Sequence, residues 1–250
     1  MIELLRSGAI TVLGRHPYAS NNAYVVQCET ETASCRALYK PVAGERALWD
    51  FPDTALAARE VAAFAVAEAL DLQCIPETVW RDDAPAGPGS LQRWIDDASI
   101  EDVAVLTDYD DSWLHVFEAQ LTDGTDVHVV HRDSEELRAI AFLDVLLNNA
   151  DRKAGHLLRG PDGHLWGVDH GVTFHAEPKL RTVLWGFVGQ TIADELLARL
   201  SVPLHELPEV ASVLNEAELA ALQDRMQALL RTRVYPEPSP DWPAVPWPVF

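Results

Sequence analysis

The sequence predicts an α+β fold of two lobes, in which a β-rich N-terminal lobe with one helix precedes a mostly helical C-terminal lobe with a short hairpin. Two observations predict it. The first third is rich in β-branched and aromatic residues separated by polar turns, and the pattern changes near residue 99. A chain of 250 residues is long enough for two such lobes. We expect lobes at 1–97 and 98–235, with a Pro-rich tail at 236–250.

The N-terminal lobe is expected to contain three consecutive strands, one helix and two short apolar runs that end the sheet. The helix has a strongly apolar pattern, and Asp53 is a suitable N-cap for it. A turn rich in Pro and Gly separates the two apolar runs. The segments are strands at 8–14, 22–29 and 35–41, a helix at 54–70, and apolar runs at 75–80 and 89–95.

The C-terminal half begins with an acidic, mixed segment at 100–124, to which the pattern assigns no element. A helix at 134–147 follows, with Ser134 as its cap. Residues 156–171 predict a strand–PDG–strand hairpin, and residues 207–234 predict one or two helices. The tail cannot be helix or central strand, and either packs by its aromatic residues or extends.

The net charge of −20, with only three lysines, opposes binding to nucleic acid or to an anionic membrane surface. No apolar run reaches the roughly 18 residues of a membrane span, and the N-terminus lacks the pattern of a signal peptide. The three cysteines have no CxxC spacing, which favours a reducing compartment. We therefore expect a cytoplasmic protein without nucleic-acid or membrane partners.

Two charged residues of the N-terminal lobe fit each other. Lys40 ends the third strand, and helical spacing puts Glu60 between Leu56 and Phe64 on the apolar face of the helix. A buried carboxylate is costly unless it is paired, so Lys40 is its natural partner. The alternative is a lysine stem lying along a strand end and a glutamate at a helix border.

A charged loop follows the helix at 134–147, inside an otherwise apolar region. Asp151, Lys153 and His156 lie within six positions, and Asp169 follows a second apolar pair in VDHG. Phosphoryl transfer needs cations on the phosphates, acids to hold metal ions and a residue to position the nucleophile. These residues supply all three. The alternative is a polar loop and a turn, with Asp169 capping a strand end.

A second motif, HRD at 131–133, is rejected as the catalytic loop. The residue five positions after Asp133 is Arg138, and the segment opens a helix, so Asp133 and Ser134 are expected to cap that helix. His131 is then expected on the surface.

The order of these motifs, with the loop NADRKAGHLL and the later VDHG, resembles the atypical kinases of the phosphatidylinositol 3-/4-kinase and HipA-like group. Residues 8–235 are similar to a family of small actinobacterial phosphatidylinositol 3-/4-kinase-like proteins. The resemblance implies a kinase-like fold, with ATP and Mg or Mn as cofactors. It assigns Lys40 and Glu60 to nucleotide binding, Asp151 and Lys153 to catalysis, and Asp169 to metal binding.

The sequence departs from the kinase pattern at two places. The first loop has no G-x-G-x-x-G, so Ser20, Asn21 and Asn22 are expected to cradle phosphate; the alternative is an ordinary hairpin turn. His156 stands where the second metal ligand is usually Asn. We expect the acids beside it, Asp151 and Asp169, to favour its protonated form.

The preferred hypothesis is an ATP- and metal-dependent phosphotransferase that acts on a protein hydroxyl or a small metabolite, because nothing in the sequence binds lipid. The alternatives are a nucleotide-binding pseudokinase, favoured by His156, and an AMP transferase that uses the same site. A metallohydrolase built on His156, His164, His170 and His175 lacks a suitable motif spacing. Trp80, Trp94 and Trp113 can stack a base or pack in the core.

Overall fold

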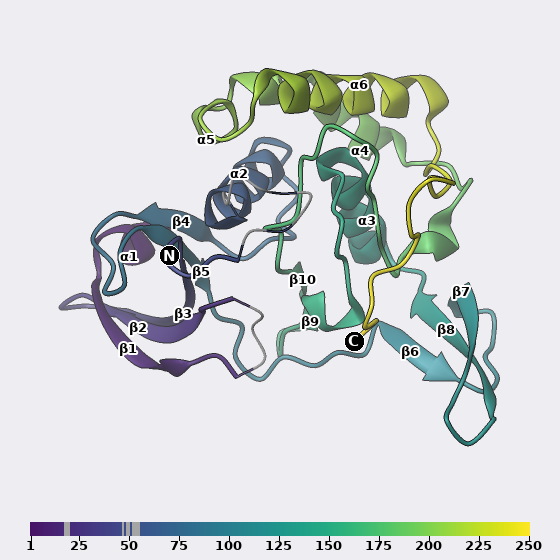
Figure 1. The fold of residues 1–250 in the computed structure, drawn as a ribbon, viewed down its shortest axis with the longest axis horizontal. Coiled ribbons are helices and arrows are strands. Elements are labelled where there is room, and N and C mark those ends of the chain that lie inside the picture. The colour runs from purple at the N-terminus through teal and green to yellow at the C-terminus, as the bar shows by residue number, and fades with distance from the viewer. Residues whose placement is uncertain (18–20, 47, 49–50, 52–55) are drawn as a thin grey trace.

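The structure is a computed structural model that describes residues 1–17, 21–46, 48, 51 and 56–250. Figure 1 shows an antiparallel sheet at the N-terminal end and a largely helical part that follows it, with a second, smaller sheet at the opposite end of the molecule. The predicted two-lobed α+β class is confirmed.

The N-terminal sheet has five antiparallel strands in the order β1-β2-β3-β5-β4. All five lie in segments predicted to be extended. Buried Val26, Tyr39 and Leu91 fill the inner side of this sheet together with Leu5 of the first helix. The strands are β1 Ala9–Arg15, β2 Tyr24–Glu29, β3 Ser34–Pro41, β4 Thr78–Arg81 and β5 Gly89–Arg93.

Two helices accompany this sheet, one more than the sequence predicts. The short helix α1, Ile2–Ser7, buries Leu5 against the sheet. The predicted helix is α2, Leu56–Ala69. The predicted cap Asp53 lies outside the described residues. The Leu56 and Ala57 N–H groups donate to the Glu45 carboxylate at 3.2 and 2.7 Å, so Glu45 satisfies the first turn of α2.

The segment at 100–124 contains strands that the sequence analysis did not assign. With the residues that follow, it forms a three-stranded antiparallel sheet in the order β6-β8-β7. A β-bulge at Val116 interrupts the alternation of side chains along β7. The strands are β6 Val103–Leu106, β7 Trp113–Gln120 and β8 Asp126–Arg132.

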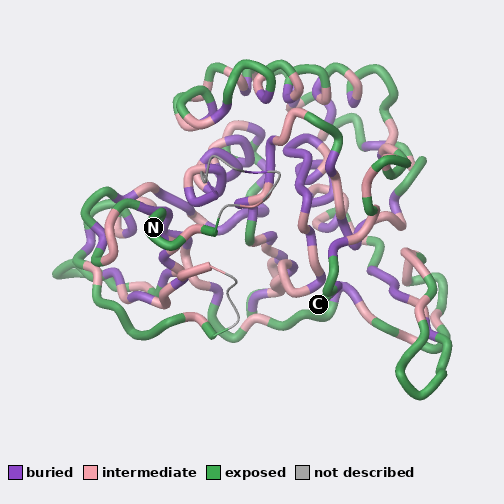
Figure 2. The backbone as a smooth tube through the Cα atoms, viewed as in Figure 1, coloured by how far each residue is buried: buried purple, intermediate pink, exposed green. Residues whose placement is uncertain are grey.

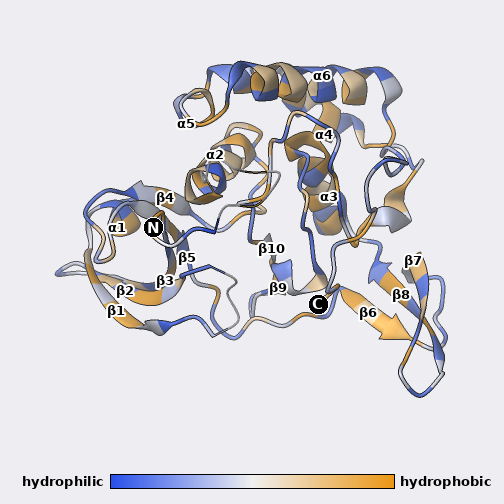
Figure 3. Ribbon diagram, viewed as in Figure 1, coloured by the Kyte–Doolittle hydropathy of each residue, from blue (hydrophilic) through white to orange (hydrophobic). Residues whose placement is uncertain are grey.

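The helices of the C-terminal half enclose the larger core. The predicted helix α3, Glu135–Leu147, begins at Ser134, whose side chain accepts the Leu137 N–H at 3.2 Å. Figure 3 shows hydrophilic and hydrophobic residues alternating along the last helix, α6, whose buried side chains include Leu222, Met226 and Leu229. The other helices are α4 Asp194–Ala198, α5 Pro208–Ala211 and α6 Glu216–Thr232, with 3-10 turns at 154–156, 185–187, 199–201 and 204–206.

The predicted hairpin is present as β9, Leu157–Arg159, paired with β10, Leu165–Gly167. It belongs to the larger core, which also takes in the inner face of α2, most of α3 and Val249 of the Pro-rich tail. Figure 2 shows this buried interior running between α2 and α3, whereas α6 and the tip of the β7–β8 hairpin are exposed on their outer sides. No helix in the described part of the chain is long and apolar enough to cross a membrane.

Candidate active site

Lys40 reaches the centre of the molecule from the end of β3. Its register partner on β5 is Ser90, and the next pair joins Pro41 to Gly89. A Cβ atom at Gly89 would collide with the Lys40 carbonyl oxygen, so the close approach of these two strands requires glycine there. Gly89 on β5 therefore allows β3 and β5 to lie close together beside Lys40.

Glu60 is buried on the inner face of α2, as the helical spacing predicts. Its Oε1 forms an ion pair with Lys40 Nζ, and its Oε2 accepts the His170 N–H at 3.0 Å. The neighbouring Arg59 is also buried, and donates to the Thr173 carbonyl oxygen and to Glu218 of α6, both at 2.7 Å. The two buried charged residues of α2 thus bind the C-terminal half, which holds the Lys40–Glu60 pair in place.

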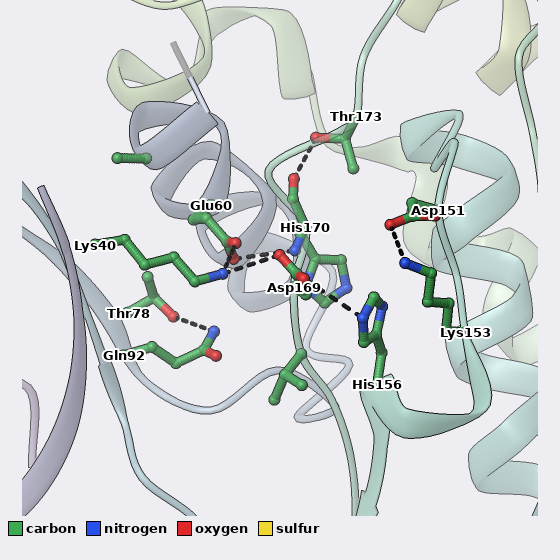
Figure 4. A network of polar contacts seen from close by, with 12 residues as sticks. Lys40, Glu60, Thr78, Gln92, Asp151, Lys153, His156, Asp169, His170 and Thr173 are labelled. Carbon is green, nitrogen blue, oxygen red and sulfur yellow. Dashed lines mark hydrogen bonds and ion pairs between the residues drawn. The ribbon is translucent and has the colours of Figure 1, made fainter. Parts of the chain in front are cut away.

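Asp169 meets Lys40 from the other side. Its Oδ1 lies 2.9 Å from Lys40 Nζ, although 129 residues separate the two in sequence. Its φ of 61° is left-handed, a conformation that is strained for a residue with a side chain and that clusters at functional sites. Figure 4 shows Lys40, Glu60 and Asp169 converging, with His156 on the far side of Asp169.

One ammonium group therefore stands between two carboxylates. Burial alone would lower the pKa of Lys40, but the charges of Asp169 and Glu60 raise it above its ordinary value. The Lys40 charge holds the pKa of Asp169 far below its usual range, whereas burial raises the pKa of Glu60. The site therefore keeps a charged lysine and a charged Asp169 at neutral pH.

The loop after α3 is held by its own buried polar groups. Arg152 is fully buried and donates to both carboxylate oxygens of Asp144, to the Val168 carbonyl oxygen at 2.7 Å, and to His170 Nε2 at 2.7 Å. Since guanidinium only donates, His170 Nε2 is an acceptor and the ring is neutral. Burial lowers the pKa of His170 in the same direction.

Asp151 is positioned by its neighbours in this loop. Asn149 accepts the Asp151 N–H at 3.0 Å and donates to Asp144 at 2.8 Å. The Asp151 carboxylate pairs with Lys153 Nζ at 3.1 Å. Burial raises the pKa of Asp151, and the nearby negative charge of Asp169 adds to the effect. A carboxylate with a raised pKa is a better proton acceptor.

His156 connects the loop to Asp169, with its Nε2 3.4 Å from Asp169 Oδ2. The Val168 N–H donates to the His156 carbonyl oxygen at 2.9 Å, so the backbone also joins the two segments. Burial lowers the pKa of His156 to about 4 and outweighs the attraction of Asp169. The expectation that its acidic neighbours favour a protonated ring is wrong, and the imidazole is neutral at neutral pH.

The phosphate-binding role expected of the first loop stays a prediction. Asn21 accepts the Arg46 N–H at 3.0 Å and so braces the segment after β3. Ser20 lies outside the described residues. The same loop supplies a residue that the sequence analysis missed: His16, whose pKa is lowered by burial and by the nearby charge of Lys40. Its ring centroid is 5.8 Å from that of Trp94, one of the candidate stacking residues.

The rejected HRD motif is structural. Asp133 accepts two hydrogen bonds from Arg138, at 2.8 and 2.9 Å, while Ser134 caps α3. His131 is fully buried against Phe187, with ring centroids 4.5 Å apart, so the expectation of a surface residue is wrong. Burial lowers its pKa to about 4. His131 is buried because it lies on the inner face of β8. The surface expectation was wrong because the sequence analysis did not assign the small sheet to which β8 belongs.

The histidines of the rival hypothesis have separate partners. His164 Nε2 lies 2.7 Å from the Gln73 carbonyl oxygen, and His175 Nδ1 accepts the Glu177 N–H at 3.0 Å. His170 binds Arg152, as described above. Within the described residues these histidines do not gather into a set of metal donors.

The Pro-rich tail packs against the loop that follows α3 and does not extend away from the molecule. The Ala154 N–H donates to the Val249 carbonyl oxygen at 2.9 Å. The Ala244 carbonyl oxygen accepts the Thr182 N–H at 3.1 Å and the Trp185 indole N–H at 2.6 Å. Thr182 in turn lies in a β-bridge with Arg152. The tail therefore braces both sides of the loop that holds Asp151.

Comparison with known proteins shows a relative that covers almost the whole chain. No protein-family model matches the chain. Protein Rv2133c of Mycobacterium tuberculosis (strain ATCC 25618 / H37Rv) is 42% identical over 266 residues, which cover 99% of this chain and 94% of that protein. The chain belongs to the family of protein Rv2133c. Because the name of Rv2133c states no activity, any function of the Rv2133c family must be argued from the site.

A solved structure also aligns with this member of the Rv2133c family. It is the crystal structure of a Helicobacter pylori proinflammatory kinase, CtkA. The alignment covers 92% of this chain and 94% of that chain, with 12% sequence identity and a TM-score of 0.45.

Proposed function

We propose that this protein is an ATP- and metal-dependent phosphotransferase of the atypical-kinase type. The observation that carries the proposal is the position of Lys40 Nζ, which lies between Glu60 of α2 and Asp169 after β10. A lysine held by a helix glutamate, next to an acid for metal, is the arrangement that phosphoryl transfer needs around a nucleotide triphosphate. The motif resemblance to the phosphatidylinositol 3-/4-kinase and HipA-like group supports the same class.

In this proposal Lys40 binds nucleotide phosphates, and Glu60 orients it. Lys40 loses no charge on burial, because its two acidic partners raise its pKa. His16 lies close enough to Lys40 for the Lys40 charge to lower its pKa, and Trp94 lies beside His16. They are suited to contact the nucleotide, and Asn21 braces the segment after β3.

Asp151 and Lys153 act on the acceptor and on the transferred group. Asp151 positions the acceptor hydroxyl, and its raised pKa favours acceptance of the hydroxyl proton. Lys153, 3.1 Å from Asp151, carries the positive charge that the transferring phosphoryl group requires. The buried Arg152 between them fixes the loop without contacting the reactants.

Asp169 and His156 are the residues that would hold the metal ion. Their facing atoms, 3.4 Å apart, are close to the roughly 3 Å expected of adjacent ligands on one ion. One carboxylate oxygen and one neutral imidazole suit Mn²⁺ better than Mg²⁺, which prefers oxygen. When bound, such an ion neutralises charge on the phosphates.

The acceptor is proposed to be a hydroxyl of a protein or of a small metabolite rather than a membrane lipid. The net charge of −20 repels anionic lipid surfaces and nucleic acid, and favours a cationic partner. A cytoplasmic location is proposed because the cysteine spacing favours a reducing compartment, and ATP is available there.

The test uses the full chain with ATP labelled in the γ-phosphate, or separately in the α-phosphate, together with Mn or Mg. Binding is measured by calorimetry and by melting temperature, which a ligand of the folded state raises. The Lys40→Met and Asp169→Asn variants should lose ATP binding or turnover, and Asp151→Asn should bind ATP yet lose on the order of 10²–10³-fold in turnover. Asp133→Asn, the same change in the rejected motif, is the matched control.

Transfer of the γ-label supports the proposal, and transfer of the α-label identifies an AMP transferase. No melting shift with ATP and either metal would overturn the proposal.

A pseudokinase is the second candidate. It is favoured by one observation: Asp169 has both carboxylate oxygens engaged by this chain, one by Lys40 and the other facing His156. ATP binding with no release of either label, in the presence of a panel of basic peptides and sugars, would select it. Turnover by the wild type that Asp151→Asn abolishes would exclude it.

A further inference from the structure

We propose that His115, Glu118 and His128 form a binding site for a divalent transition-metal ion of the zinc type. The three residues lie on β7 and β8, in the small sheet that Figure 1 shows at the opposite end of the molecule from the N-terminal sheet. This site is separate from the Lys40–Asp169 network and does not depend on the proposed function.

The register of the sheet puts these three side chains on one face. Glu118 stands directly opposite His128, and His115 stands opposite Val130, two positions along from His128. Residues 115 and 118 would point to opposite faces of a regular strand, because side chains alternate with period two. The bulge at Val116 removes this mismatch and aims His115 and Glu118 to the same side.

The donor atoms are already close to the distances of a coordination shell. One ring nitrogen of each histidine and one carboxylate oxygen of Glu118 lie within 4.8 Å of one another. Donors about 2.1 Å from a tetrahedral ion are separated by about 3.4 Å. His115 and Glu118 are exposed, so rotation about their side-chain bonds can bring the donors closer together.

The ring of His128 is partly buried on β8, the central strand of the sheet. Its Nδ1 is shielded from solvent and has no hydrogen-bond partner among the residues that the structure describes. Tyr109 packs edge-on against His128 at 5.2 Å and stacks on His115 at 6.3 Å, as centroid distances. Tyr109 therefore lies beside both rings, and the partly buried His128 loses less freedom on binding an ion than the exposed His115 and Glu118.

The donor set defines the class of ion. Two imidazoles and one carboxylate suit zinc, cobalt or nickel, whereas magnesium and calcium prefer shells made of oxygen. Three protein ligands leave a fourth position for water or for a donor from a partner molecule. The acidic surface of the protein, with a net charge of −20, raises the local concentration of any cation.

A bound ion would clamp β7 to β8. β7 is an edge strand, and Figure 2 shows the hairpin that joins it to β8 as exposed. A ligand that binds only the folded sheet raises the melting temperature, here by about 5–10 °C at a hundredfold excess over its dissociation constant.

The experiment titrates the metal-free full chain with Co²⁺, whose visible absorption bands report four-coordination, and then displaces it with Zn²⁺. We expect one equivalent of four-coordinate Co²⁺ per chain, a rise in melting temperature and displacement by Zn²⁺. His115→Ala and His128→Asn should each weaken binding at least tenfold. Glu118→Gln, a change at an exposed residue that cannot disturb the core, should also weaken it.

Controls separate this site from other donors. His205→Ala removes a histidine outside the site and should leave the titration unchanged. His156→Asn should also leave this Co²⁺ spectrum unchanged, because His156 lies beside Asp169. Equal Co²⁺ affinity in the wild type and in the Glu118→Gln and His115→Ala variants would overturn the proposal, as would loss of the spectrum in His156→Asn alone.

Discussion

Arg152 and Asp144 form a fully buried pair with two parallel hydrogen bonds, from Nε and Nη2 to the two carboxylate oxygens at 2.7 and 2.9 Å. Arg152→Leu leaves the Asp144 charge buried without its partner. We expect this variant to lose about 3–5 kcal/mol of unfolding free energy. Urea denaturation measures the loss.

The pair of Arg138 and Asp133 is the matched control, since it has the same two-bond geometry but is partly exposed. Asp133→Ala should cost about 0–1 kcal/mol. The double variant Asp144→Leu with Arg152→Leu should recover part of the loss, because no charge remains buried. Similar costs at the two pairs would contradict this account of the loop.

His156 should determine the metal preference of the proposed enzyme. His156→Asn replaces an imidazole nitrogen with an amide oxygen, a ligand that suits Mg²⁺ better. We expect the ratio of Mg-dependent to Mn-dependent turnover to rise several-fold, as measured by labelled-phosphate transfer. His164→Asn, on the β9–β10 turn, should leave the ratio unchanged. If His156→Asn binds ATP but is inactive with both ions, His156 has a specific chemical role instead.

The tail should affect turnover more than nucleotide binding. Deleting residues 244–250 removes the carbonyl acceptors for Thr182 and Ala154, which brace the loop of Asp151. A misplacement of about 1 Å in a reacting group can cost on the order of 10²-fold in rate. We expect a loss of that size in turnover, while ATP affinity stays near the wild-type value because Lys40 and Glu60 are untouched.

Trp247→Ala tests whether the loss comes from the bracing contacts, since this tail side chain is 84% exposed. It should behave as the wild type in both assays. A deletion variant with normal turnover would show that the loop keeps its shape without the tail.

His131 should make stability depend on pH. Burial lowers its pKa from 6.5 to about 4, so between these values the unfolded chain binds more protons than the folded chain. The unfolding free energy should therefore fall as pH drops through this window, by up to about 1.4 kcal/mol per pH unit from this residue. His131→Asn should reduce the slope, measured by urea denaturation at successive pH values. An unchanged slope would mean that the folded His131 takes up a proton.

The Lys40–Glu60 pair could be predicted because the helical period alone puts an acid on the apolar face of α2. The hairpin of β9 and β10 could be predicted because the PDG turn separates two short apolar runs. In both cases a local pattern determines the structure, so no long-range information is needed.

The small sheet could not be predicted in this way. The bulge at Val116 breaks the alternation of β7, and its outer face is polar, so the segment at 100–124 has no simple period. Missing this sheet also misplaced His131, which lies on the inner face of β8.

The role of Arg152 was hidden for another reason. In sequence it belongs to a charged loop, and only its partners on α3 and after β10 make it a core residue.

The bracing of the loop after α3 by later segments has a consequence for biosynthesis. A chain leaves the ribosome from its N-terminus, and its earlier parts fold first. The partners of Lys40 are complete once Asp169 has emerged, whereas Arg152 and Ala154 also await residues 181–183 and 244–249. A nascent chain would therefore complete the centre of Lys40, Glu60 and Asp169 before the loop that holds Asp151, and the contacts with the tail would be the last to form.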